Sequence, residues 1–450
     1  MNSDRVALRV ADMSFDAIPQ AARQRARERL LDTIGTALGG AATKAARMAA
    51  AAMTDPGEAS TLIPGAPTRT ETAAAFVSAV SASALDYDDG HYLGGAIHPS
   101  SVIVPTVLVA ASTRPVDLPT FLAAQVAGFE VAVRAAHLLW PRHETNRWFC
   151  TGTAGAVGAA AAAAKVRGGD ADTIRRAMLI AWAHAPISAL QWPTVKEAIG
   201  WSAATAVTAC RLAEQGWMAI PHETAPALAP TIFPPTPFDE PHAAGDPFVD
   251  SLGSTFEIER SYLKPHAACR YTHTAADALN DLLADGLRAH HIHSIRVATH
   301  HWATFLTHRR PPSLEHAQYS YPFVLAALAV HGQAGPDQIA EHRLHDPAIL
   351  DIASRVKVVH DPELDVHLPQ HYGTQLDIHL TDGTTMRLEP RLVARGDPAD
   401  PMSTAEQDDK FAGLVTPLST VATDRLRQAL ADGSDTTVFW RAIARAGREQ

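Results

Sequence analysis

Cysteine is scarce in this chain. Three cysteines occur, Cys150, Cys210 and Cys269, separated by 60 and then 59 residues, and no C-x-x-C pair is present. This spacing does not support a disulfide framework or a zinc ribbon, and it is typical of a protein from a reducing compartment. Clustered thiolates are missing as well, which argues against an iron–sulfur cluster.

The chain also lacks an excess of positive charge and a long, strongly hydrophobic run. It has 38 Lys and Arg against 48 Asp and Glu, a net charge of -10, which gives no indication of nucleic acid or an anionic membrane as a partner. Its most apolar stretch, TGTAGAVGAAAAAAKVRG, is mainly Ala and Gly and does not predict a membrane span. The N-terminal MNSDRVALRVADMSFDAIP has no basic region leading into an apolar one, as a secretory signal would. We therefore expect a soluble, cytoplasmic protein.

Helical periodicity dominates the first half of the chain. With 450 residues, 46% of them hydrophobic, there is enough material for two or three domains with a sizeable core. Apolar residues recur in steps of four from residue 18 to 38, as on one face of a helix. Similar patterns cover residues 70–85, 100–113, 118–139, 151–166 and 197–215. Their faces are rich in Ala and Gly, which favours close helix packing.

The pattern changes near residue 256. Residues 256–263 and 292–300 alternate like strands, and 374–390 predicts a hairpin around Asp382-Gly383. An amphipathic helix is expected between the first two strands. After residue 395, Ser403 and Glu406 form a capping box and helical sequence resumes to the end. The Pro-rich segment 225–241 cannot be a helix interior and is expected to be a long ordered loop.

These patterns predict a mainly α fold. A large all-α helical domain is expected from both chain ends, residues 1–264 and 396–450. A smaller α+β lid domain, residues 265–395, is inserted into it.

The stretch LDYDDGHYLGGAIHPSS, residues 85–101, gathers titratable groups between two apolar helices. Asp86, Asp88, Asp89, His91 and His98 lie in it, and Pro99-Ser100 begins a helix whose free amides suit an anion. These groups are typical of a functional loop. A solvated turn whose carboxylates cap helices remains the alternative.

Two further segments carry candidate residues. Lys196 lies at the start of an apolar helix, where it either serves as a buried charge or extends its amine to solvent. The segment YLKPHAACRYTHTAADAL places Lys264, Cys269 and Arg270 at the expected domain junction, a preferred ligand location. The alternative is a linker with helix caps, in which Cys269 is a small buried hydrophobe.

The motif SLEHAQYSYPFVLAALA contains Tyr319, whose hydroxyl either reaches a site or lies at the edge of the core. The histidine-rich segment 290–301 is not expected to bind metal. Adjacent histidines on a strand point in different directions, and no Asp or Glu sits at ligand spacing among them.

Four stretches together resemble the MmgE/PrpD family: LDYDDGHYLGGAIHPSS, KPHAACRYTHTAADAL, EHAQYSYPFVLAALA and RGDPADPMS. This family includes 2-methylcitrate dehydratase, cis-aconitate decarboxylase and iminodisuccinate epimerase. The resemblance implies the two-domain arrangement above, a homodimer, and a site between the domains without metal or cofactor. It also implies a small anionic carboxylate as substrate.

The resemblance extends to individual positions. Asp86 and His98 match the acidic residue and histidine of the first motif, and Lys196 and Lys264 match two lysines of the site. Cys269 occupies a position that is histidine or cysteine in the family. Two departures stand out: Gly90 replaces a frequent threonine, and Phe149 replaces a frequent histidine.

The resulting hypothesis is proton transfer at a carbon next to a carboxylate. His98 acts as acid or base and is oriented by Asp86, with His91 and Tyr319 as further proton donors. Fixed positive charge from Lys196, Lys264 and Arg270 stabilises the carbanion. The catalytic candidates are therefore Asp86, His91, His98, Lys196 and Lys264, and the substrate-binding candidates are Gly90, Ser100, Cys269, Arg270 and Tyr319.

Among reactions, dehydration of a 2-methylcitrate-type hydroxy acid is favoured over cis-aconitate decarboxylation and amino-dicarboxylate epimerisation. A non-catalytic binding protein that kept the fold is the alternative from another class.

Overall fold

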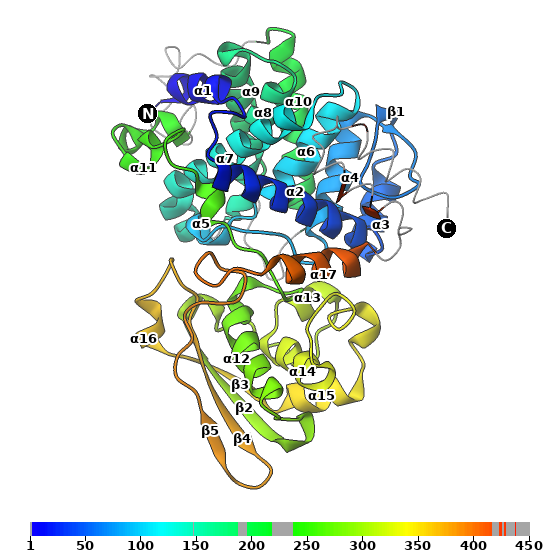
Figure 1. The fold of residues 1–450 in the computed structure, drawn as a ribbon, viewed down its shortest axis with the longest axis vertical. Helices are drawn as coiled ribbons and strands as arrows, with labels where there is room; N and C mark the ends of the chain where they lie inside the picture. Colours follow the sequence, from blue (N-terminus) through cyan, green and yellow to red (C-terminus); the bar gives the residue numbers. More distant parts are fainter. Residues whose placement is uncertain are drawn as a thin grey trace.

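The computed structural model describes residues 2–146, 148–187, 196–217 and 237–415, together with isolated positions at 423–424, 427–428 and 437. Figure 1 shows a larger helical part and a smaller part with a sheet, so the expectation of a mainly α fold is confirmed.

The helical segments expected in the first half are present. They are α2 (Gln20–Gly40), α4 (Glu71–Ser83), α6 (Ser100–Ser112), α7 (Leu118–Asn146), α8 (Cys150–Val166) and α10 (Lys196–Glu214). The same part also contains α1 (Ser3–Asp12), α3 (Lys44–Ala52), β1 (Pro56–Ala59), α5 (Leu93–Ala96), α9 (Ala171–Ala183) and α11 (Pro247–Asp250).

Small residues let α7 and α8 pack closely. A Cβ on Gly128 would lie 2.8 Å from the carbonyl oxygen of Gly158, and a Cβ on Gly158 would lie 2.5 Å from that of Gly128. Only glycine at both positions allows this approach of the two backbones. In α7, the stretch Leu118–Trp140 is long and apolar enough to cross a membrane, yet 94% of its most apolar window is buried within the protein. Core packing therefore explains its hydropathy.

The smaller part is built around a four-stranded sheet in the order β3-β2-β4-β5. Its strands are β2 (Ile292–Thr299), β3 (Val356–His360), β4 (Thr374–Leu380) and β5 (Thr385–Arg387). In the central strand β2, Val297 pairs with Val358 of the parallel β3 and with Leu376 of the antiparallel β4. The predicted hairpin is confirmed, and Gly383 in its turn has φ 89°.

The remaining helices are α12 (His273–Ala284), α13 (Leu314–Gln318), α14 (Tyr321–His331), α15 (Pro347–Ser354), α16 (Pro362–Asp365) and α17 (Thr404–Leu414). Helix α12 is the amphipathic helix that the sequence predicts before β2. Helix α12 packs against β4, and α14 packs against β3.

The strand prediction for residues 256–263 is wrong. Glu257–Arg260 form a 3-10 helix instead. The buried carboxylate of Glu130 accepts hydrogen bonds from the backbone amides of Glu257 (2.9 Å) and Ile258 (3.0 Å). Those amides therefore have a side-chain partner in place of a neighbouring strand.

Helix α17 brings the chain back to the first part. It begins with the predicted capping box of Ser403 and Glu406, and its Phe411 packs against Gly35 of α2. In Figure 1 it lies along the boundary between the helical part and the smaller part. The predicted domain bounds at 264–265 and 395–396 stay predictions. The expected helix after residue 415 and most of the expected loop 225–241 fall outside the described residues, apart from short 3-10 turns at Pro237–Asp239 and Pro241–Ala243.

Candidate active site

The loop between α4 and α6 lies at this boundary. Leu85 and Tyr87 are buried in the hydrophobic cluster of the smaller part, whereas Ile97 belongs to the cluster of the helical part. Between Leu85 and Tyr87, Asp86 has φ 49°, a conformation that costs a non-glycine residue free energy. Such a conformation persists only where its surroundings hold it.

Buried lysines hold this strained backbone. The Lys264 amine donates to the Asp86 carbonyl (3.0 Å), and the Lys410 amine of α17 donates to the Tyr87 carbonyl (2.8 Å). Lys410 also pairs with the buried Asp32 of α2 (2.7 Å). Three segments far apart in the sequence therefore fix the position of Asp86.

The side chain of Asp86 brings Lys196 and Lys264 together. Its Oδ1 lies 3.5 Å from Lys196 Nζ and 3.2 Å from Lys264 Nζ, and all three side chains are buried. The Tyr319 hydroxyl also approaches Oδ1, at 3.5 Å. The predicted convergence of the two lysines is thus seen in the structure.

This cluster has more positive than negative charge. Burial favours the neutral form of Asp86, but the charges of Lys196 and Lys264 outweigh this effect and hold its pKa at about 2. Asp86 is therefore an anion at neutral pH. In the described part of the chain, no other carboxylate pairs with either lysine. Counted by themselves, these three side chains place two amines against one carboxylate, an arrangement that suits a further anion.

His98 is held so that one ring nitrogen is available. Its Nδ1 lies 2.8 Å from the Asp89 carbonyl oxygen, which can only accept, so Nδ1 carries the proton. The neutral ring then has a lone pair on Nε2, for which no hydrogen bond is found among the described residues. Burial lowers the pKa of His98, which favours this neutral, basic form.

The hypothesis that Asp86 orients His98 is wrong. The Asp89 carbonyl fixes the ring, and the Asp88 carboxylate lies 3.6 Å from Nδ1. Asp86 instead makes its contacts with the lysines. Within the described residues, the effect of Asp86 on His98 is that of its charge, which raises the pKa of the ring.

Ser100 is already bonded to the loop. Its hydroxyl donates to Asp89 Oδ2 (2.6 Å) and its amide to Asp89 Oδ1 (3.3 Å). The start of α6 thus binds the protein's own carboxylate, where a substrate anion was expected. Burial raises the pKa of Asp89 to about 7, although Arg29, 3.7 Å away, opposes this.

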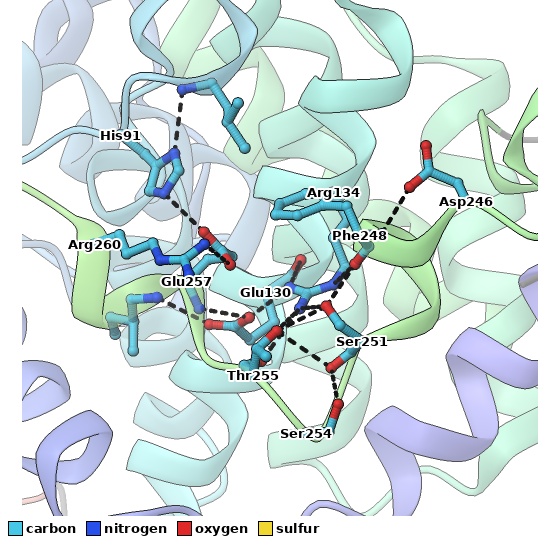
Figure 2. Close-up of polar contacts among 12 residues, drawn as sticks. His91, Glu130, Arg134, Asp246, Phe248, Ser251, Ser254, Thr255, Glu257 and Arg260 are labelled. Atoms are coloured by element: carbon cyan, nitrogen blue, oxygen red, sulfur yellow. Dashed lines mark hydrogen bonds and ion pairs between the residues drawn. The ribbon is translucent and has the colours of Figure 1, made fainter. Parts of the chain in front are cut away.

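His91 takes part in the polar network of Figure 2, where its ring points toward Glu257. Its Nδ1 accepts from the Leu93 amide (3.2 Å), and its Nε2 lies 3.3 Å from Glu257 Oε2, in ion-pair range but without good hydrogen-bond geometry. Burial lowers its pKa. With both nitrogens directed at protein groups, His91 does not fit the predicted role of proton donor.

The same network anchors the segment 246–260 to α7. Arg134 pairs with Glu130 (2.5 Å) and donates to the Phe248 carbonyl, the Ser251 hydroxyl and the Thr255 carbonyl at 3.0–3.2 Å (Figure 2). Its role is structural, and it supports the chain that leads to Tyr262 and Lys264.

Arg270 does not fit the predicted carboxylate clamp. Its guanidinium donates to the carbonyls of Ala394 (3.4 Å) and Arg395 (3.0 Å), to the Tyr92 hydroxyl (3.1 Å) and to His273 Nδ1 (3.3 Å). A bidentate carboxylate would have to displace these partners. Arg270 instead ties the segment 394–395 to the loop after α4.

Cys269 and Tyr319 lie beside the cluster. Burial raises the pKa of the Cys269 thiol to about 12, with Asp86 adding to the effect, so it is no thiolate nucleophile at neutral pH. Lys196 Nζ lies 5.9 Å from the centre of the Tyr319 ring. Both positions remain candidates for substrate contact.

The structure explains why glycine, and not a larger residue, occupies position 90. A Cβ at this position would lie 2.2 Å from the Tyr262 hydroxyl oxygen. Gly90 and Tyr262 also exchange two backbone hydrogen bonds, at 2.9 and 3.2 Å. The Tyr262 ring therefore fills the space beside Gly90. At the other departure, Phe149 is buried at the start of α8 without capping it.

The sequence analysis did not single out several residues that contact the loop 85–101 or support it. Arg29, Asp32 and Lys410 lie in ordinary amphipathic helix patterns, and only their burial in the folded chain distinguishes them. The discounted histidine segment also has a partner that spacing could not reveal. His301, on the exposed side of the smaller part, meets His360 and Asp365 with ligand atoms within 4.8 Å of one another.

Two family models match most of the chain. The MmgE/PrpD N-terminal domain matches residues 4–227, and the MmgE/PrpD C-terminal domain matches residues 266–436. The chain is 25% identical to cis-aconitate decarboxylase-like protein oryM of Aspergillus oryzae, over 79% of this chain and 77% of that protein.

It is also similar to the cis-aconitate decarboxylases of Homo sapiens and Mus musculus. The human enzyme is 24% identical over 76% of this chain and 72% of its own length, and the mouse enzyme 27% identical over 70% and 66%. These relatives are lyases. The two matched domains span most of the sequence, and the chain therefore belongs to the MmgE/PrpD family.

Proposed function

We propose that this protein is a cofactor-independent lyase that acts on a di- or tricarboxylate by moving a proton at a carbon next to a carboxylate. The first candidate is dehydration of a hydroxy-tricarboxylate of the 2-methylcitrate type. The observation that carries the proposal is the convergence of Lys196 and Lys264 on one oxygen of Asp86, deep in the protein.

The charge of this cluster suits the chemistry. Removing a proton beside a carboxylate creates an enolate-like dianion, which needs fixed positive charge where the negative charge grows. The two lysines exceed the charge of Asp86 by one, and their burial strengthens their attraction for an anion. Asp86 keeps both amines in place before the substrate arrives.

His98 is suited to take the proton. With Nδ1 bonded to the Asp89 carbonyl, Nε2 accepts the proton as the C–H bond breaks. The electron pair forms the carbon–carbon double bond as the C–O bond breaks, and the hydroxyl leaves as water after receiving a proton. Tyr319, whose hydroxyl contacts Asp86, is the candidate donor of that proton.

Decarboxylation is the second candidate, and the similarity to cis-aconitate decarboxylases favours it. It uses the same cluster, because loss of carbon dioxide also leaves an electron pair on carbon beside a carboxylate. The difference lies in His98, which then has to deliver a proton to carbon.

A substrate panel tests the proposal. The purified chain is incubated in D₂O with 2-methylcitrate, citrate and cis-aconitate, while alkene absorbance, carbon dioxide release and deuterium incorporation by NMR are followed. An amino-dicarboxylate is added and monitored by optical rotation for epimerisation. We expect alkene formation from a hydroxy acid, slowed roughly 10²- to 10⁴-fold in the matched control His98→Gln. Release of carbon dioxide alone would select the decarboxylase, and the absence of every signal would refute catalysis.

A further inference from the structure

The Tyr262 hydroxyl is a buried polar group without a hydrogen-bond partner in the described structure. Tyr262 is completely buried, and its hydroxyl oxygen lies where a side chain on Gly90 would begin, 2.2 Å from an ideal Cβ at that position. Such a group is unfavourable in a folded protein unless something else bonds to it. The hydroxyls of two other buried tyrosines near Asp86 do have partners: that of Tyr319 contacts Asp86, and that of Tyr87 donates to the Pro265 carbonyl (3.1 Å).

The ring of Tyr262 is rigidly placed. The Arg270 guanidinium lies 4.4 Å from its centre, and Tyr92 packs against it at 5.0 Å. The backbone of Tyr262 pairs with Gly90, and that of Leu263 donates to Gly396 (3.0 Å). The hydroxyl is thus held in one position by contacts that do not involve its oxygen.

The extended backbone of residues 262–264 directs the side chains of Tyr262 and Lys264 to the same side. Residues 262–264 are non-helical and bonded on alternate sides, to Gly90 and then to Gly396. In such an extended segment, side chains two residues apart point to the same side. Tyr262 therefore shares its side with Lys264, which binds Asp86. Gly90, under the hydroxyl, follows Asp89, whose carbonyl orients His98.

We infer that the Tyr262 hydroxyl donates a hydrogen bond to a carboxylate oxygen of the substrate, in a subsite between Lys264 and the His98 loop. This inference rests on the proposed function and adds a specificity-determining residue to it. Burial raises the pKa of Tyr262 well above its ordinary value, so the hydroxyl keeps its proton at neutral pH and acts as a neutral donor.

The test is Tyr262→Phe, which removes one oxygen and keeps the ring on Arg270. The matched control is Tyr321→Phe, because the equally buried Tyr321 hydroxyl already donates to the Tyr271 carbonyl (2.6 Å). Binding of citrate and cis-aconitate to wild type and both variants is measured by calorimetry, together with thermal unfolding. We expect Tyr262→Phe to weaken carboxylate binding roughly 10- to 100-fold, as for a hydrogen bond to a charged group, without lowering Tm. Tyr321→Phe should lower Tm and leave affinity unchanged.

Equal affinity of wild type and Tyr262→Phe would overturn this inference and leave the proposed function standing. A fall in Tm of Tyr262→Phe comparable to that of the control would also overturn it, because the hydroxyl would then be structural. A wild-type protein that binds none of the carboxylates would refute the proposed function, and the subsite with it.

Discussion

Replacing Asp86 by asparagine removes the one carboxylate that Lys196 and Lys264 share, with little change in shape. The pKa of Asp86 falls from 3.8 to about 2 in the folded protein, which corresponds to about 2 kcal/mol of stabilisation at neutral pH. Breaking a buried ion pair on one side typically costs about 3–5 kcal/mol. We therefore expect Asp86→Asn to lower the free energy of unfolding by roughly 2–5 kcal/mol.

The stability difference between wild type and Asp86→Asn should depend on pH. Because the folded protein lowers the pKa, the stabilisation is present above the unfolded pKa, near 4, and is lost as the pH falls through about 2. Urea unfolding should thus show a constant difference between wild type and variant from neutral pH down to about pH 5, and a shrinking one below.

Asp365 provides a matched control, since its pKa is also about 2 but its side chain is 28% exposed. Asp365→Asn should cost at most about 1 kcal/mol. An Asp86→Asn protein as stable as this control would refute the account of the lysine cluster.

Three further predictions follow from neighbouring contacts. His98→Gln should reduce turnover roughly 10²- to 10⁴-fold with an unchanged Tm, measured by deuterium exchange into the carboxylate substrate, and near-normal turnover would remove His98 as the base. Lys410→Met should cost roughly 3–5 kcal/mol in urea unfolding because Asp32 loses its buried partner, and adding Asp32→Asn should recover part of the loss; strictly additive effects would contradict the pairing. Gly90→Ala should destabilise by about 1–3 kcal/mol in thermal or urea unfolding, because its Cβ meets Tyr262, and a neutral effect would show that the ring is free to move.

Much of the fold follows from local pattern. Steps of four apolar residues predicted α2, and alternation around Asp382-Gly383 predicted the hairpin of β4 and β5. These two predictions succeeded because the spacing of apolar residues within a single element is enough to define its buried face. The strand predicted at 256–263 failed because its amides bond to Glu130, over 120 residues earlier, and no local pattern reports such a partner.

The sequence by itself determined which residues could carry chemistry: it singled out Asp86, His98, Lys196 and Lys264 from their types and their resemblance to one family. Only the tertiary structure decided their roles. In the folded chain, His98 is oriented by the Asp89 carbonyl, and Arg270 and His91 are bonded to or paired with other protein groups. The tertiary structure also placed the Tyr262 hydroxyl beside Gly90, without a hydrogen-bond partner among the residues that the structure describes. The physical reason is that burial and hydrogen-bond saturation are properties of the folded surroundings, to which segments hundreds of residues apart contribute.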